Sequence, residues 1–306
     1  MSIQSIQAKY PSAIWFDSNY VGTNSGTLAQ PYDDLPTAMA ASDSNAKVIA
    51  IKDGSHTVSQ IGGSGTATNF SFSGTADKLS LVGESTNAVL NFNSGASFGT
   101  AINFRTFGGS FTNKDIHLET LKISVNSNQA NQYGAVYCSD GGNLNIEGCV
   151  IEQGSNTLAA TNNWGLCRGG ATATAVYTIK NSIISVGHTR TNSFDGLLLT
   201  DQTSPGFHTF NCQGNTIVVP SGVGLRLSGL SFSTSSTYKN NIFVGAGNSE
   251  VLGFTPSVSG GNCFHNTGIS SGNGGVVFAD PLFVDSANGD YRLRPSSPCI
   301  GAATAS

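Results

Sequence analysis

The hydrophobic and polar positions of this chain follow a short pattern that the sequence repeats six times. The clearest copy is Ile146–Ile151, which reads apolar, polar, Gly, Cys, apolar, apolar. The other copies start at Leu118, Ile179, Cys212, Tyr238 and Ser259, and neighbouring copies begin 21 to 33 residues apart. Repeats of this length are typical of stacked structural units, each of which buries its apolar face against the next.

The third position of the pattern is Gly or Asn in five of the six copies: Gly148, Asn181, Gly214, Asn240 and Gly261. These residues tolerate a left-handed backbone, so the pattern indicates strand, tight bend, strand. The fourth position is Asn in the last three copies, and stacked bends would align Asn215, Asn241 and Asn262 into a ladder of hydrogen-bonded amides. No stretch keeps a helical period over ten residues. The sequence therefore predicts an all-β fold, a single-stranded right-handed parallel β-helix.

A second set of strands starts at glycines 28 to 31 residues apart: Gly134, Gly165, Gly196 and Gly224. Alternation in the last copy points Leu225 and Leu227 inward. An outward column then follows, made of Val136, Cys167, Leu198 and Arg226. Such an apolar strip is either covered by a loop or forms a contact between subunits. Arg168 would face inward, as a buried paired charge or as a sign that the alignment is wrong.

The chain divides into three segments of one structural domain. We expect an entry strand and a capping helix in residues 1–46, β-helix coils in residues 47–268, and a closing segment in residues 269–306. The helix is predicted within Pro31–Ser42, with Asp34 as its N-cap and Pro36 in its first turn. It would cover strand edges that are otherwise open to other chains.

Both ends resemble a known superfamily. A strand ending in Phe16-Asp17, a polar loop and an Ala-rich helix resemble the opening of pectate-lyase-like right-handed β-helix proteins. The segments Ala279–Asp285 and Asn288–Gly301 resemble the closing part of the same superfamily. The resemblance implies the fold. It implies no single activity, because these segments occur in lyases, hydrolases, adhesins and virion proteins.

Composition narrows the choice of partners. A net charge of −4 with 14 Lys and Arg gives no basic surface for nucleic acid. No apolar run approaches the roughly 20 residues of a membrane span. Met1–Gln7 lacks the charged and apolar regions of a secretory signal. The six cysteines are interpreted as reduced packing residues in preference to disulfides or metal ligands, and we expect no metal and no cofactor.

Candidate catalytic residues come from the densest ionisable stretch and from Lys180 before it. That stretch contains His188, Arg190, Asp195, Asp201 and His208. A lyase would use His188 as the base and Arg190 or Lys180 to neutralise a uronate. The alternative is a set of solvated loop charges. Asp195 and Asp201 flank one strand and would lie about 20 Å apart, too far for a hydrolase pair within one coil.

Candidate ligand contacts are Trp164, Arg168 and His208. A further outward polar column is formed by Glu147, Lys180, Gln213 and Lys239. It is interpreted as a solvated sheet face or as a stripe that contacts carbohydrate.

Three classes of function remain. The first is a virion surface protein of a phage, such as a tail spike, a fibre module or a capsid-decorating protein. The charge-poor sequence, the apolar column for a homotrimer and an extracellular type of fold without a signal peptide favour it. Its partners would be other virion proteins or a surface polysaccharide. The alternatives are an extracellular lyase or hydrolase of an acidic polysaccharide, which would make the chain an enzyme, and an adhesin.

Overall fold

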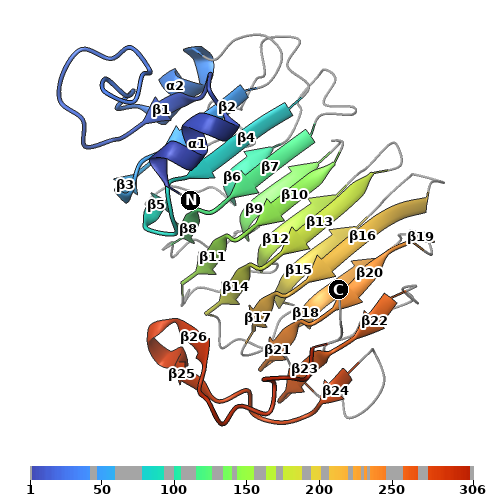
Figure 1. Ribbon diagram of the computed structural model, residues 1–306. Helices are drawn as coiled ribbons and strands as arrows, with labels where there is room; N and C mark the ends of the chain where they lie inside the picture. Colours follow the sequence, from blue (N-terminus) through green and yellow to red (C-terminus); the bar gives the residue numbers. More distant parts are fainter. Residues whose placement is uncertain are drawn as a thin grey trace.

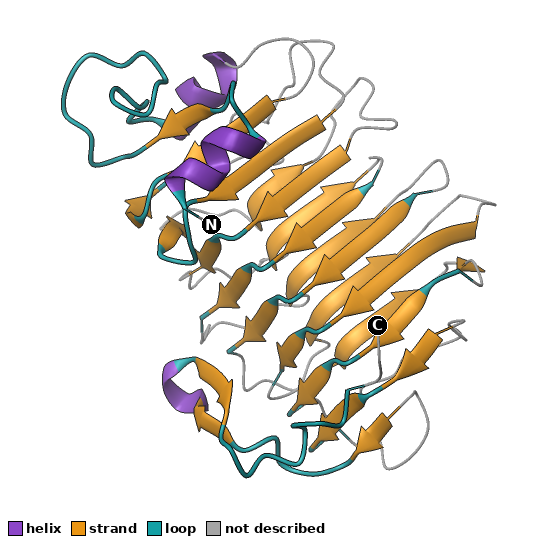
Figure 2. Ribbon diagram, in the orientation of Figure 1, coloured by secondary structure: helices purple, strands orange, loops and turns teal. Residues whose placement is uncertain are grey.

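The structure is a computed structural model in which successive strands stack into long parallel sheets (Figures 1 and 2). It describes residues 2–41, 47–58, 78–92, 100–104, 115–125, 134–139, 143–154, 163–169, 175–187, 194–200, 207–219, 223–228, 231–232, 235–245, 258–267 and 275–303. In strands β6, β9, β12 and β15, only the backbone is described.

Apart from a C-terminal hairpin, the strands in these residues form three parallel sheets, here called A, B and C. Sheet A has the order β1 (Ile14–Phe16), β2 (Lys47–Ile51), β4 (Lys78–Gly83), β7 (Asp115–Glu119), β10 (Leu144–Glu147), β13 (Val176–Lys180), β16 (Phe207–Gln213), β20 (Thr237–Lys239) and β22 (Val258–Gly260), and β19 (Ser231–Phe232) also pairs with β16. Sheet B contains β3 (Gly54–Thr57), β5 (Ala88–Phe92), β8 (Lys122–Val125), β11 (Val150–Gln153), β14 (Ile183–Val186), β17 (Thr216–Val218), β21 (Ile242–Val244), β23 (Asn262–His265) and β24 (Gly275–Val277). Sheet C contains β6 (Thr100–Phe104), β9 (Gly134–Ser139), β12 (Asn163–Gly169), β15 (Phe194–Thr200) and β18 (Val223–Ser228).

The chain visits the sheets in a fixed order. From β10 it passes to β11 in sheet B, to β12 in sheet C, and back to β13 beside β10 in sheet A. Each pass pairs in parallel with the next, so the all-β architecture with long parallel sheets is confirmed and is consistent with a parallel β-solenoid. Strand β1 extends sheet A into the expected entry segment, and β24 extends sheet B past residue 268.

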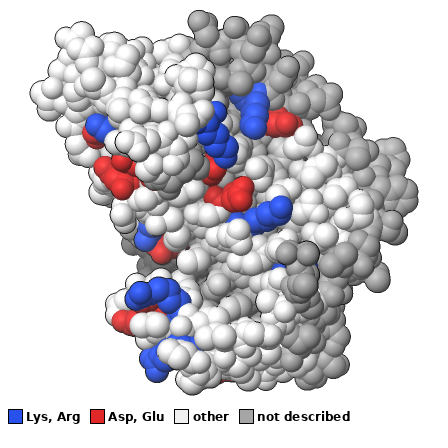
Figure 3. Space-filling view, in the orientation of Figure 1, with Lys and Arg blue, Asp and Glu red and all other residues white. Residues whose placement is uncertain are grey.

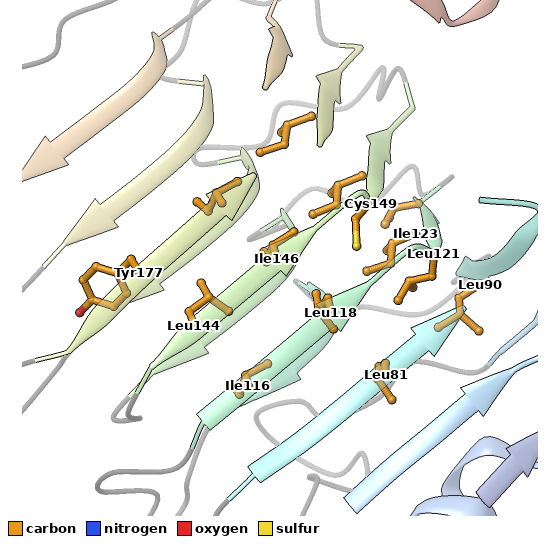
Figure 4. Close-up of a cluster of buried hydrophobic side chains, with 14 of the residues drawn as sticks. Leu81, Leu90, Ile116, Leu118, Leu121, Ile123, Leu144, Ile146, Cys149 and Tyr177 are labelled. Atoms are coloured by element: carbon orange, nitrogen blue, oxygen red, sulfur yellow. The ribbon is translucent and has the colours of Figure 1, made fainter. Parts of the chain in front are cut away.

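The bend between sheets A and B has the predicted backbone. The third position of all six copies has φ between 50° and 69°, in Thr120, Gly148, Asn181, Gly214, Asn240 and Gly261. This left-handed residue turns the chain sharply from one sheet into the next. The apolar first and sixth positions face the interior, as Leu118, Ile146 and Ile151 do, all without exposed surface. Figure 4 shows Leu118 and Ile146 among the buried side chains that project from successive strands.

The fourth position of the bend forms a continuous chain of hydrogen bonds between coils. The amide Nδ2 of Asn215 donates to Oδ1 of Asn241 (3.0 Å), and Nδ2 of Asn241 donates to Oδ1 of Asn262 (3.1 Å). The same oxygens accept the backbone N–H of Asn215 and of Asn241. The ladder continues towards the N-terminus, because Ser182 N–H donates to Asn215 Oδ1 and Cys149 N–H donates to Ser182 Oγ.

The register observed in sheet C differs from the predicted alignment at the first strand of one column. Leu166 pairs with Leu197 and Leu197 with Leu225, as aligned, but Leu166 pairs with Val136 in place of Ala135. Val136 therefore stands in the column of the buried Leu225, and Tyr137 takes its place beside Cys167. A slip of one residue exchanges the two faces of a strand.

Both ends of the stack carry additional elements. Helix α2 (Leu35–Ala41) follows the predicted N-cap, since Oδ2 of Asp34 accepts the backbone N–H of Thr37 (2.9 Å). Helix α1 (Ile3–Lys9) was not predicted. At the C-terminal end, β25 (Phe283–Asp285), the 3-10 helix η1 (Ser286–Asn288) and β26 (Asp290–Leu293) form an antiparallel hairpin. Its Tyr291 hydroxyl bonds to Ser185 Oγ on β14 (3.0 Å).

Candidate functional site on the outer face of sheet A

Helix α1 lies across the outer face of sheet A near β2 and β4 (Figure 1). Two outward side chains there are apolar and buried, Ala50 on β2 and Val82 on β4, and the polar Ser80 on β4 is buried as well. Ile6 of α1 packs with them and with Trp15, and it has no exposed surface. The helix therefore covers a small apolar cluster on this face that would otherwise be exposed to water.

The C-terminal end of α1 is fixed to sheet A by a buried carboxylate. Glu119 on β7 accepts from Lys9 Nζ at 2.6 Å and from the Tyr10 hydroxyl at 2.7 Å, one bond to each oxygen. Burial would raise the pKa of Glu119, but the hydrogen bonds from Lys9 and Tyr10 outweigh it and lower the pKa below its ordinary value. Charged hydrogen bonds of this kind are stronger than neutral ones.

His117 stands beside Glu119 on the same strand. Its Nε2 lies 3.5 Å from Oε2 of Glu119, and neither ring nitrogen has a hydrogen-bond partner within the described part of the chain. Burial lowers the pKa of His117 to about 4, although the Glu119 carboxylate acts in the opposite direction. The imidazole is therefore neutral at pH 7.

Two carboxylates meet on this face. Glu119 and Glu147 are register partners on β7 and β10, and adjacent strands lie about 4.8 Å apart. A retaining glycosidase needs carboxyl groups at about 5 Å. However, both oxygens of Glu119 are occupied by Lys9 and Tyr10, and its side chain is only 7 % exposed. Glu119 therefore anchors α1 and is closed to a substrate, and the exposed Glu147 stands without it as an open partner.

Beyond α1 the outer face of sheet A is polar in two columns. The first column consists of Asn145, Thr178, Asn211 and Thr237, and the second of Glu147, Lys180, Gln213 and Lys239. Thr237 Oγ1 donates to Asn211 Oδ1 (3.0 Å). Most of these side chains are half-buried, Glu147 is exposed, and Lys239 is buried. In Figure 3 acidic and basic side chains lie near one another, and most of the described surface in this view is uncharged.

The predicted catalytic residues are only partly placed. Lys180 ends β13 in sheet A, next to Glu147 and Gln213 in register. Asp195 belongs to sheet C, where it is the register partner of the predicted ligand contact Trp164. Arg168 is in register with Leu199 of β15, so the predicted alignment holds at that position. His188, Arg190 and Asp201 lie outside the described residues. Among the residues placed, the structure therefore brings Trp164 and Asp195 together and keeps Lys180 on a different sheet.

His208 is a core residue, which corrects its prediction as a ligand contact. It has no exposed surface, its Nδ1 accepts the backbone N–H of Ala175 (3.1 Å), and its ring stacks on Tyr177 with centroids 5.4 Å apart. The cause is strand alternation, because His208 shares the inward face of β16 with Phe210 and Cys212.

A Ser-His-Asp group occurs near the N-terminal end of the stack, but its geometry is structural. The Ser18 hydroxyl lies 3.1 Å from His56 Nδ1, and Asp17 Oδ1 lies 3.8 Å from the same nitrogen. A catalytic triad places the nucleophile and the acid on opposite ring nitrogens. Here the second nitrogen, Nε2, donates to the Lys52 carbonyl (2.8 Å), so His56 holds the loop after β1 against β3.

No three His, Cys, Asp or Glu side chains in the described part of the chain lie close enough together to hold a metal ion. Neither α1 nor α2 is long and apolar enough to cross a membrane. The cluster of Lys9, Tyr10, His117 and Glu119 was not predicted from the sequence. Its only signal there was the polar second position of the repeat, which Glu119 occupies.

Comparisons of this chain with protein-family models, with curated proteins and with solved structures found no match.

Proposed function

We propose that the chain is a structural protein of a phage virion surface, a tail spike, fibre or capsid-decorating module, that binds a polysaccharide along the outer face of sheet A. We further propose that its coils form a single-stranded right-handed β-helix of the pectate-lyase-like kind. The observation that carries the binding proposal is the pair of polar columns that runs from β10 to β20.

The chemistry of the columns suggests the class of ligand. Amides and hydroxyls at Asn145, Thr178 and Asn211 offer both donors and acceptors, and strand stacking repeats them about every 4.8 Å. An extended polymer with repeating hydroxyl groups is complementary to such rows. Because Glu147 and Lys180 offset each other, we expect neutral glycans to bind better than polyanions.

The binding experiment compares dextran, alginate and polygalacturonate by calorimetry with the full chain. The double variant Asn145→Ala/Asn211→Ala should weaken binding of dextran at least tenfold, because hydrogen bonds to a ligand are lost. The matched control Thr216→Ala, half-exposed on the outer face of sheet B, should bind like the wild type. Equal binding by the double variant and the control would contradict the proposed face.

The same samples test the enzymatic alternative. A structural protein leaves the polysaccharides intact, whereas a lyase creates unsaturated ends that absorb ultraviolet light and a hydrolase creates new reducing ends. The mass in solution adds a second test, since we propose a homotrimer with contacts at the corrected sheet C column of Tyr137, Cys167, Leu198 and Arg226. Cleavage of alginate or polygalacturonate by a monomer would refute the virion proposal in favour of the enzyme.

A further inference from the structure

The last coil contains an outward position that is buried. On the outer face of sheet B, the residues Val150, Ile183, Thr216 and Ile242 follow one another in register and are all half-exposed. Cys263 on β23 is the next member of this column, yet it is only 3 % exposed. At this last member of the column, the Cys299 side chain of the closing segment meets the Cys263 thiol.

The residue that meets Cys263 is another cysteine. Cys299 belongs to the turn after the hairpin, where its N–H donates to Ser297 Oγ (3.2 Å) and its carbonyl accepts from Ala302 N–H (3.4 Å). Its side chain is partly exposed and shares a side-chain hydrogen bond with the Cys263 thiol. Both thiols are free in this structure. Two neighbouring thiols that share a hydrogen bond, and that lie 36 residues apart along the chain, are candidates for a covalent bond.

We propose that Cys263 and Cys299 form an intrachain disulfide that fastens the closing segment to the last coil. The partner reagent is a small disulfide of the glutathione class, acting by thiol–disulfide exchange. This inference does not depend on the proposed virion role.

The two cysteines have different parts in the exchange. The hydrogen bond from the Cys263 thiol lowers the pKa of Cys299, and the same bond together with burial raises the pKa of Cys263. Cys299 is also the more exposed of the two, so its thiolate attacks the small disulfide and releases one reduced thiol. Cys263 then loses its proton and attacks the Cys299 sulfur, which releases the second reduced thiol. In balance, the protein loses two protons and two electrons, and one small disulfide becomes two thiols.

The other described cysteines provide an internal control. Burial raises the pKa of Cys149 and of Cys212 to about 12 in each case. Both lie inside the stack, Cys149 1 % exposed and Cys212 fully enclosed, so neither forms a thiolate accessible to a small disulfide at pH 8.

The experiment incubates the folded full chain with oxidised glutathione, alkylates free thiols after unfolding, and maps the peptides without reduction. We expect a peptide pair joined through Cys263 and Cys299 that is lighter by two hydrogen atoms, with Cys149 and Cys212 alkylated. The oxidised protein should also melt several degrees higher than the reduced protein, and limited proteolysis should release the closing segment more slowly.

Variants separate the steps. Cys263→Ser should stop the reaction at the mixed disulfide of Cys299 with glutathione, and Cys299→Ser should leave Cys263 unmodified. Cys149→Ser is the matched control and should form the bond as the wild type does. Should Cys263→Ser fail to fold, the wild-type peptide map decides alone. Wild-type protein that keeps both thiols free, or that accumulates glutathione on Cys299 without resolving it, would overturn the proposal.

Discussion

The side chain of Asn241 occupies the centre of the hydrogen-bond ladder, so its removal is the sharpest test of what holds the coils in register. Its Oδ1 accepts the backbone N–H of Asn215 (3.1 Å), and its Nδ2 donates to the carbonyl of Cys212 (3.0 Å). The side chain has no exposed surface. Asn241→Ala therefore leaves two main-chain groups without these partners in a place that water does not reach.

Each unsatisfied buried group costs about 1–3 kcal/mol, so the two groups together should cost the variant about 2–6 kcal/mol of local stability. A loss of about 3 kcal/mol raises the equilibrium population of the locally open state roughly 100-fold. Hydrogen exchange followed by mass spectrometry is the appropriate assay, because unfolding of a long repeat array need not be two-state. The peptide that contains Asn215 should exchange faster by about that factor.

The control is Asn211→Ala, on the strand that leads into the Asn215 bend. This side chain is half-buried on the outer face and its described bond is with Thr237. Truncation there should cost less than about 1 kcal/mol, because water can replace the lost partner. If Asn241→Ala changed exchange at Asn215 no more than Asn211→Ala does, the ladder would not be what keeps the coils in register.

Two further predictions concern the N-terminal helix and the bend. In a Trp164→Phe background, Trp15 fluorescence should report release of α1 as the pH falls from about 6.5 towards about 4. The pKa of His117 is about 4 in the folded protein against an ordinary 6.5, so the undocked state binds the proton first and docking loses stability over this range. The pKa of Glu119 is also lowered in the folded protein, so its protonation removes further docking stability at lower pH. His117→Asn should remove the upper part of this transition, and an unchanged profile would exclude His117 as its source. Gly148→Ala should cost about 1–2 kcal/mol in denaturant unfolding for its left-handed backbone alone. Gly214→Ala should cost more, because its Cβ would lie 2.6 Å from Asn181 Oδ1, and adding Asn181→Gly should remove the excess if that contact is its cause.

The bend could be predicted from the sequence because one backbone requirement selects few residue types. A left-handed position accepts Gly and Asn readily, and the six copies display that preference in a single column. Even Thr120, which breaks the pattern, takes φ 53°, because its bend pairs with the bend of the next coil at Gly148. The alternating strands of sheet C carry no such marker at their first copy, which is why Val136 was placed one residue out of register.

Helix α1 and the Glu119 cluster could not be predicted for a different reason. Seven residues with a single fully buried side chain, Ile6, form no stable helix alone. The helix is held by contacts with residues more than 100 positions away, such as Lys9 and Tyr10 with Glu119. The interaction of Cys263 with Cys299 could not be predicted either, because the spacing of residues along the chain does not indicate which coil a closing segment covers.

The asparagine ladder ends next to the closing segment, at the C-terminal end of the stack. Along the fourth position of the bend, Leu121 and Cys149 give way to Ser182 and then to three asparagines, so the corners become polar as the chain proceeds. Asn215 and Asn241 each need the coil after them, since the backbone N–H of each donates to the Oδ1 of the next asparagine. Asn262 is the last rung, and Cys263 follows it directly in β23. Loss of the final coil would leave Asn241 N–H without its acceptor. A displaced Asn241 would in turn weaken the bond that its Oδ1 accepts from Asn215 N–H. A closing segment held at Cys263 therefore protects the rung on which the preceding corners depend.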